Sequence, residues 1–261
     1  MFALFPSRAV AAIIFGFPVH WYGILYFLAF LNAGTLLPKL QKYRSLTFSK
    51  DVWMSVLSAG ILGVIIGGRL GFVLFYEPEY FLANPLKVFA VWEGGMSSHG
   101  GFIAVIFALF VVHRRHNIPS RALADLATVP AAIGLALGRI GNFINQELFG
   151  TVTTLPWGMN VPGVEGLRHP LQIYDAFLSL GIALVCYVHL RNPKSIPGRT
   201  AAIFLMLYGV MRFLLEFIRE QQYPLTEFWG LTLTRGQLLT IPIFLAGFVT
   251  FLFVREITDK R

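Results

Sequence analysis

Long apolar segments recur along this chain, and each is long enough to cross a lipid bilayer as a helix. A spanning helix needs about 20 predominantly apolar residues at a rise of ~1.5 Å per residue. Seven segments qualify, so the sequence predicts an all-α polytopic integral membrane protein with seven transmembrane helices. The predicted spans are Val19–Leu37, Val52–Tyr76, Gly95–Val112, Ala122–Ile144, Gln172–Leu190, Thr200–Ile218 and Gln237–Val254. We expect one membrane domain over residues 1–261, with 145–171 as a short extracytoplasmic loop or head region.

Composition excludes a soluble globular protein. Only 13% of the residues are charged and 56% are hydrophobic, whereas a soluble domain carries about 25% charged residues. The apolar run Ala9–Phe17 is too short to span and lacks a convincing small-residue cleavage site. A removed signal peptide is therefore disfavoured, and we expect this run to lie at the membrane interface.

The basic residues are divided unequally between the two sides of the membrane. Thirteen fall in connections on one side and four on the other, and cytoplasmic loops carry the excess of Lys and Arg. This predicts an extracytoplasmic N-terminus and a cytoplasmic C-terminus. The net charge of +8 thus reflects orientation, and no nucleic-acid partner is expected. The four residues on the outer side are Arg8, Lys87, Arg168 and Arg235.

Four arginines remain inside the predicted spans, namely Arg69, Arg139, Arg212 and Arg219. Each costs at least about 2.5 to 3.5 kcal/mol to insert, so buried arginines usually snorkel, pair or line a cavity. Counted from the cytoplasmic ends of their spans, all four lie about 20 to 30 Å up. Tyr22 and His99 lie about one helical turn from the outside. These positions predict a polar cavity that opens to the extracytoplasmic leaflet.

Helical spacing groups several of these side chains. Arg212, Glu216 and Arg219 share one face at i, i+4 and i+7, and Arg139 and Asn142 share another at i and i+3. One interpretation is a structural ion pair between Arg212 and Glu216. One glutamate cannot neutralise four arginines, so the cavity also favours an anion. The guanidinium fork matches the oxygens of a phosphate, which phospholipid headgroups supply in the outer leaflet.

The third predicted span begins with the glycine-rich stretch Glu93-Gly94-Gly95-Met96-Ser97-Ser98-His99-Gly100-Gly101. Two Gly pairs indicate close backbone approach, and free amides at a helix N-terminus can bind an anion. Ser97 or Ser98 could instead cap the helix. His99 is the one histidine predicted at the level of the arginines, either as a structural residue or as a base.

Other chemistries lack their motifs in this sequence. No GxSxG, HExxH, Walker loop, CxxC or acidic metal cluster is present, so neither a cofactor nor a metal is expected. The lone cysteine, Cys186, is predicted to be a core residue. Two glycine pairs with small-xxx-small spacing are predicted to serve helix packing, Gly63 with Gly67 and Gly134 with Gly138.

Several motifs together resemble the bacterial prolipoprotein diacylglyceryl transferases. Residues 138–150 read GRIGNFINQELFG and match the fixed positions of that family's signature. His99-Gly100-Gly101 resembles its His-Gly-Gly motif, and Trp21-Tyr22-Gly23 resembles its first-helix motif. Gly67-Gly68-Arg69-Leu70-Gly71 and the set Arg212, Phe213, Glu216, Phe217 and Arg219 also fit. Where the family has His-Pro-Ser-Gln-Leu-Tyr-Glu, this chain reads His169-Pro170-Leu171-Gln172-Ile173-Tyr174-Asp175.

The resemblance implies a transferase of the bacterial inner membrane with its active site on the extracytoplasmic side. Its members move the diacylglyceryl group of phosphatidylglycerol to the lipobox cysteine of a preprolipoprotein, forming a thioether and releasing glycerol phosphate. It implies phosphatidylglycerol, the lipobox segment and the bilayer as partners.

On the basis of this resemblance we predict a role for each candidate site residue. Arg139 and Arg212 hold the lipid phosphate, helped by amides near Gly100, and His99 acts as base or positions substrate. Glu216 holds the arginines, while Arg69 and Arg219 are structural or lie at the entrance. The remaining substrate-binding residues are Tyr22, Gly101, Asn142, Glu147 and Gly150.

Two other classes of protein remain open. A transporter or flippase for an anionic solute or lipid would also use arginines inside the membrane. It should show inverted repeats and a midplane site, and the sequence shows no internal repeat. A noncatalytic lipid-binding scaffold would leave the glycine-flanked His99 without a purpose.

Overall fold

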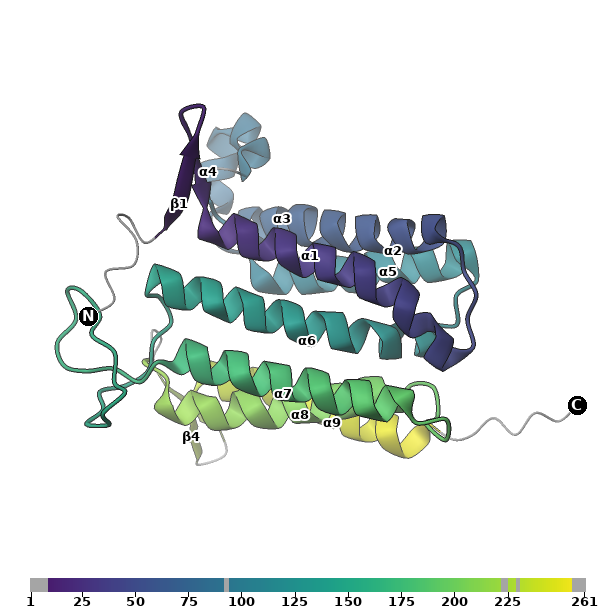
Figure 1. Ribbon diagram of the computed structural model, residues 1–261. Coiled ribbons are helices and arrows are strands. Elements are labelled where there is room, and N and C mark those ends of the chain that lie inside the picture. The colour runs from purple at the N-terminus through teal and green to yellow at the C-terminus, as the bar shows by residue number, and fades with distance from the viewer. Residues whose placement is uncertain (1–8, 92–93, 222–224, 229–230, 255–261) are drawn as a thin grey trace, which may run out of the picture. The chain divides into compact units, whose positions relative to one another are not determined.

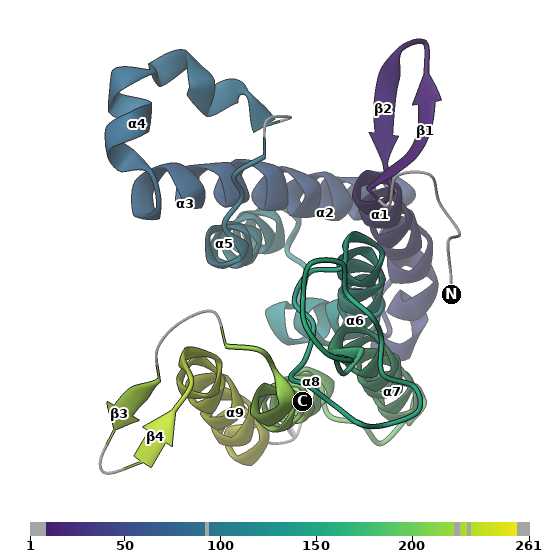
Figure 2. The same cartoon turned by 90° about the vertical axis from the view of Figure 1, so that its left-hand side faces the viewer.

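The computed structural model describes residues 9–91, 94–221, 225–228 and 231–254. By its contacts the chain divides into two compact units, one formed by 1–36 with 124–261 and the other by 37–123. Figures 1 and 2 show the helices and strands of both units. The two units are described separately below.

The first unit contains five long helices. They are α1 (Trp21–Leu40), α6 (Ser120–Asn145), α7 (Leu171–Arg191), α8 (Arg199–Leu215) and α9 (Arg235–Phe253). The last residues of α1 and the first residues of α6 belong to the second unit. Helix α8 packs against both α7 and α9. A 3-10 turn, Glu216–Ile218, extends α8, and a capping box of Thr234 and Gln237 starts α9. Charged side chains of α6, α7 and α8 contact one another in this unit.

Two small β-hairpins precede helices of this unit, and the sequence did not predict them. Strand β1 (Val10–Ile14) pairs antiparallel with β2 (Phe17–His20), and β3 (Thr226–Phe228) pairs with β4 (Leu231–Leu233). Figure 2 shows each hairpin leading into a helix, β1–β2 into α1 and β3–β4 into α9. The prediction of an all-α chain thus holds for the long apolar segments but not for these connections. The run predicted to be interfacial forms the first hairpin, with its tip residue Phe15 fully exposed.

The N-terminus of α8 is held by a buried carboxylate from α6. Asp125, which is fully buried, accepts hydrogen bonds from the amides of Gly198 and Ala201, each at 2.8 Å. The first amides of a helix have no partner within the helix, so an outside acceptor satisfies them. Asp125 thereby ties α6 to the start of α8.

The second unit is built on one long helix that lies beside another (Figure 1). The long helix runs through α2 (Lys50–Leu62), a π-helical turn (Gly63–Gly67) and α3 (Gly68–Phe75), and it packs on α5 (Ser98–His116). Shorter elements are a 3-10 turn after α1 (Gln41–Arg44), α4 (Pro78–Ala83) and a 3-10 helix (Pro85–Phe89). A Cβ atom at Gly67 or Gly100 would overlap the facing helix. The packing role predicted for Gly63 and Gly67 is therefore confirmed.

The second predicted glycine pair is only half right. Gly134 lies against Ala29 of α1, since a Cβ built there would be 3.6 Å from that methyl group. A Cβ at Gly138 would meet nothing within 4 Å. Gly138 therefore does not serve close helix packing, which corrects the prediction for that residue.

Six helices in the described part of the chain are long and apolar enough to cross a membrane. They cover Trp21–Arg44, Lys50–Phe75, Ser120–Asn145, Leu171–Arg191, Arg199–Ile218 and Arg235–Phe253. Helix α5, the third predicted span, is 19 residues long but ends in His113, Arg114, Arg115 and His116. The structure thus shows a polytopic membrane protein with six such helices. The seventh span and the orientation of the termini stay predictions.

Candidate active site

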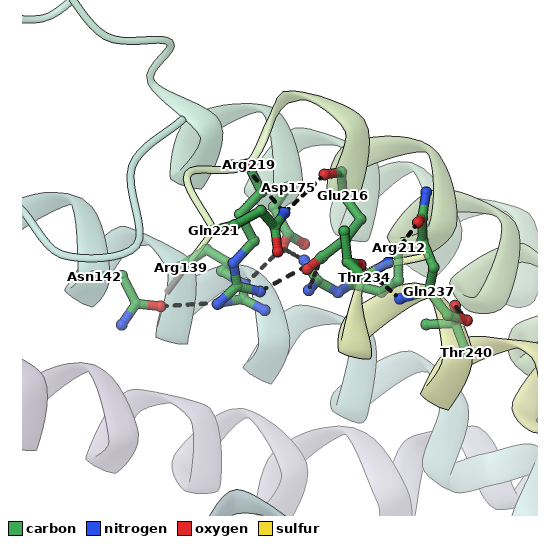
Figure 3. Close-up of polar contacts among 10 residues, drawn as sticks. All are labelled: Arg139, Asn142, Asp175, Arg212, Glu216, Arg219, Gln221, Thr234, Gln237 and Thr240. Carbon is green, nitrogen blue, oxygen red and sulfur yellow. Dashed lines mark hydrogen bonds and ion pairs between the residues drawn. The ribbon is translucent and has the colours of Figure 1, made fainter. Parts of the chain in front are cut away.

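A carboxylate on α7 joins arginines from two neighbouring helices. Asp175 Oδ2 lies 2.7 Å from Arg139 Nε of α6 and 3.3 Å from Arg212 Nη1 of α8. Asp175 and Arg212 are buried, while the side chain of Arg139 keeps about a fifth of its surface exposed. Figure 3 shows these side chains pointing toward one another. Asp175 therefore fixes the relative positions of the two arginines.

A second carboxylate, Glu216, continues the chain of charges. Its Oε2 lies 3.0 Å from Arg212 Nη2 and 3.6 Å from Arg219 Nη1 (Figure 3). A Cβ atom at Gly236, in the first turn of α9, would overlap the Glu216 carboxyl group. Glu216 thus rests against the positive end of α9, where a negative charge is stabilised. We call Arg139, Asp175, Arg212, Glu216 and Arg219 the arginine–carboxylate cluster.

The cluster carries more positive than negative charge. It holds three guanidinium groups and two carboxylates, which leaves one positive charge in excess among these five residues. Burial and then the neighbouring Arg212 lower the pKa of Arg219, although an arginine stays protonated in proteins. Such an uncompensated charge favours binding of an anion.

A hydrogen-bonded network extends from Arg139 toward α1. Arg139 Nη1 donates to Asn142 Oδ1 at 3.2 Å, and Asn142 Nδ2 donates to Tyr22 Oη at 3.1 Å and to Glu147 Oε1 at 2.7 Å. The ring of Tyr22 lies against Gly141, where a Cβ would come within 2.8 Å of it. The structure therefore brings Tyr22, Asn142 and Glu147 together beside Arg139.

Gly150 lies in the connection between α6 and α7, where two backbone segments cross it closely. Its amide donates to His169 O at 2.9 Å, and the next amide donates to Ile218 O at 2.9 Å. A Cβ at Gly150 would come within 2.6 Å of His169 Cβ and 2.7 Å of Ile218 O. Gly150 also forms an isolated β-bridge with Arg219. Its role in the structure is to let the connection pass next to the cluster.

A small cavity opens among the charged side chains of the cluster. Leucine side chains and one amide complete its wall. It is lined by Arg139, Leu148, Leu171, Gln172, Asp175, Arg212 and Arg219. The cavity is therefore positively charged on several sides, with an apolar border.

The main omission of the sequence analysis is Asp175. It occurs in one of the quoted motifs without a predicted role. It gives the arginines a second carboxylate besides Glu216. An ionisable residue inside a predicted span is itself a signal of function or pairing. Asp175 could have been found on that ground.

Arg69 does not need an anion, which corrects the count of four uncompensated arginines. Its guanidinium group in α3 donates to five backbone carbonyl oxygens within the second unit. They belong to Lys87, Val88, Ala90, Gly94 and Gly95, at 2.5 to 3.2 Å. The group also lies 4.9 Å from the centre of the Phe81 ring. Of the two roles predicted for Arg69, structural or at the entrance, these contacts support the structural one.

The N-terminus of α5 is capped by Ser97, a residue of the glycine-rich stretch. The Ser97 hydroxyl accepts from Gly100 N at 3.3 Å, and Ser97 O accepts from Gly101 N at 3.0 Å. Both amides already have acceptors, so the structure gives no support for their role as anion ligands. Gly100 instead allows α5 to approach α3 closely. His99 lies in the first turn of α5, and its side chain is outside the described residues.

Cys186 lies on α7, away from the arginine–carboxylate cluster. Cys186 is a free, fully buried cysteine of α7, eleven residues along the helix from Asp175, which confirms that it is a core residue. Among the described residues, no group of three or more His, Cys, Asp or Glu side chains could hold a metal ion.

Comparison with known proteins shows which family the whole chain resembles. The sequence model of prolipoprotein diacylglyceryl transferases matches residues 9–253. The chain is 45% identical over 239 residues to the phosphatidylglycerol--prolipoprotein diacylglyceryl transferase of Wolbachia pipientis from Culex pipiens, covering 90% of each protein. It is 44% identical to the protein of that name from Polynucleobacter asymbioticus, covering 97% of this chain and 98% of the relative. The corresponding protein of Geobacter sulfurreducens is 43% identical over 229 residues, with 87% and 88% covered.

Proposed function

Since the chain belongs to the prolipoprotein diacylglyceryl transferase family, we propose that the arginine–carboxylate cluster is where it carries out its reaction. The protein is a transferase that moves a diacylglyceryl group from phosphatidylglycerol to a prolipoprotein. The observation that carries the assignment is the cavity lined by the guanidinium groups of Arg139, Arg212 and Arg219. The proposal thus assigns a known activity to particular side chains.

The lipid phosphate is held by Arg139 and Arg212. Asp175 already engages Nε of Arg139, and Asn142 accepts from its Nη1, so Nη2 is the nitrogen of that arginine left for a phosphate. Arginine donors in a planar fork match the oxygens of a phosphodiester, and they are strong because both partners are charged. Arg219, whose guanidinium group pairs with Glu216 at 3.6 Å and with no other carboxylate among the described residues, adds positive charge beside them.

The transfer step makes a carbon–sulfur bond and breaks a carbon–oxygen bond. The sulfur of the lipobox cysteine attacks the carbon of the diacylglyceryl group that is bonded to the phosphate oxygen, and glycerol phosphate leaves with the electrons of that carbon–oxygen bond. The thiol proton must be removed, because a thiol of pKa about 8.5 is only a few per cent ionised at neutral pH. His99 is the proposed base or positioning group. The arginines stabilise the charge that develops on the leaving phosphate.

The network around Asn142 orients Arg139. Asn142 accepts from Arg139 and donates to both Tyr22 and Glu147, so the guanidinium plane is fixed from two sides. A catalytic group must be held close to its productive geometry, since small displacements reduce the rate strongly. Tyr22, Asn142, Glu147 and Glu216 are therefore proposed to position the arginines and the headgroup.

The membrane side follows from the distribution of charge. The excess of basic residues in one set of connections supports a cytoplasmic C-terminus, with α5 as a seventh span. The cluster then faces the extracytoplasmic leaflet of the bacterial inner membrane, where the lipobox of a preprolipoprotein is presented.

A reconstituted assay tests this assignment. Purified protein in phosphatidylglycerol vesicles, given a lipobox peptide, should increase the peptide mass by one diacylglyceryl group. We expect Arg139→Ala and Arg212→Ala to lower the rate by about 100-fold or more, while Cys186→Ser, remote from the cluster, stays active. Substantial activity in both arginine variants would contradict the assignment.

A further inference from the structure

Gln172 lines the cavity and also carries a buried acceptor without a partner among the described residues. It lies in the first turn of α7, three residues before Asp175, and its side chain is only 1% exposed. Its Nε2 donates to Glu147 O at 2.6 Å, whereas its Oε1 is buried with no hydrogen-bond partner in the part of the chain that the structure describes. Buried polar atoms almost always have a partner, so each exception calls for an explanation.

The orientation of this amide is fixed by its neighbour. A backbone carbonyl oxygen such as Glu147 O only accepts hydrogen bonds, so the Gln172 nitrogen must face it. The flipped amide would bring two acceptors to 2.6 Å. The atom left without a partner is therefore an acceptor, and it needs a donor.

The cavity's proposed ligand offers few donors. The non-bridging oxygens of a phosphodiester only accept hydrogen bonds, so they suit the arginines and not Gln172 Oε1. The donors on phosphatidylglycerol are the two hydroxyl groups of its headgroup glycerol. An ammonium headgroup also carries donors, but the excess positive charge of the cluster opposes it.

Resting on the proposed function, we infer that Gln172 Oε1 accepts a hydrogen bond from a headgroup glycerol hydroxyl and thereby selects phosphatidylglycerol. Gln172 and the arginines then divide the headgroup between them. The arginines bind the phosphate, and the amide reads the alcohol beyond it. A site built to hydrogen-bond a hydroxyl group discriminates strongly against an analogue that lacks it, because its own polar group is then left unpaired.

The test combines a change in the protein with a change in the lipid. Wild type and Gln172→Leu are assayed with phosphatidylglycerol and with phosphatidylpropanol, which has the same headgroup length without hydroxyl groups. We expect wild type to prefer phosphatidylglycerol about tenfold or more in kcat/KM. In Gln172→Leu the preference should shrink to less than about threefold, through a lower rate with phosphatidylglycerol alone.

Two further variants separate recognition from structural damage. Leu171→Met alters an apolar residue of the same cavity and should change kcat/KM for both lipids by the same factor. Gln172→Glu keeps an acceptor but loses the donor to Glu147 O, so it should keep the preference at a lower overall rate. A ratio of two lipids within one preparation does not depend on the fraction of protein that is folded.

The outcomes are decisive in both directions. A wild-type enzyme that uses phosphatidylpropanol as well as phosphatidylglycerol overturns the inference, whatever the variants do. A Gln172→Leu enzyme that stays measurably active and keeps the wild-type preference also overturns it, because the residue then acts only through Glu147 or a bound water. If Gln172→Leu is inactive with both, the wild-type preference and its retention in Gln172→Glu decide. The proposed function fails separately, when Arg139→Ala and Arg212→Ala remain active.

Discussion

Asp175 Oδ2 lies 2.7 Å from Arg139 Nε, the inner nitrogen of the guanidinium group. The contact holds the side chain from its inner edge. One outer nitrogen, Nη1, donates to Asn142, and Arg139 lines the cavity. The carboxylate thus positions the arginine without covering the part that a phosphate would use.

The first prediction concerns the charge of Asp175. Asp175→Asn keeps the size of the side chain but leaves Arg139 and Arg212 without their shared counterion. We expect kcat/KM for lipid transfer to fall about tenfold or more, since breaking a buried pair by removing one partner is costly. Asp175→Glu restores the charge and should recover most of the activity. Equal activity in Asp175→Asn and wild type would show that the carboxylate does not position the arginines.

The second prediction concerns the contact between Gly236 and Glu216. Gly236→Ala puts a methyl group where the Glu216 carboxyl group lies, so the carboxylate must move away from Arg212 and Arg219. We expect lower kcat/KM in the vesicle assay. Gly181→Ala on α7 is the matched control, because a Cβ there meets nothing within 4 Å. The control should behave as wild type, and identical rates for the two variants would rule out a positioning role for this contact.

The third prediction concerns Arg69 and the segment it holds. Arg69→Lys keeps the charge but loses the planar fork that reaches five carbonyl oxygens. We expect a lower melting temperature in detergent and faster proteolysis between residues 84 and 95. Arg115→Lys, which changes an exposed residue of α5, serves as control. Unchanged proteolysis of Arg69→Lys would mean that the carbonyl contacts contribute nothing to the order of this segment.

The fourth prediction concerns the cap of α8. Asp125→Ala leaves the amides of Gly198 and Ala201 without their acceptor. We expect a loss of about 1 to 2 kcal/mol in stability, measured as a lower melting temperature. Asp51→Asn changes an exposed carboxylate in the first turn of α2 and should cause a much smaller shift. A melting temperature of Asp125→Ala equal to that of Asp51→Asn would contradict the capping role.

Hydropathy and charge predicted the helical part of the fold because lipid imposes a simple length and polarity requirement. Six of the predicted spans coincide with helices that meet it. Helix α5 does not, since the polar residues at both of its ends lower its mean hydropathy. The hairpin at Val10–His20 was missed because its continuous apolar run carries no alternation of polar residues, so periodicity could not distinguish strand from helix.

The site was predicted in part for a similar reason. Helical spacing identified Arg212, Glu216 and Arg219 as neighbours, and they do meet although only Arg212 lies in α8. Glu216 begins the 3-10 turn that follows α8, and the backbone of Arg219 is extended. The partnership of Asp175 with Arg139 joins two helices, and no periodicity within a sequence reveals which helices lie together. The sequence predicted that Arg69 needs a partner, but it could not show which one. The acceptors are backbone carbonyl groups, which every residue has.

Helix α8 is fastened at both ends to different helices. Asp125 of α6 holds its first amides, and Asp175 of α7 holds Arg212 near its last turn. The helix cannot slide or rotate as a rigid rod without breaking one attachment. The height of Arg212 in the membrane is therefore set in part by a carboxylate about 20 Å away, and a substitution at that remote end can disturb the reaction without touching lipid.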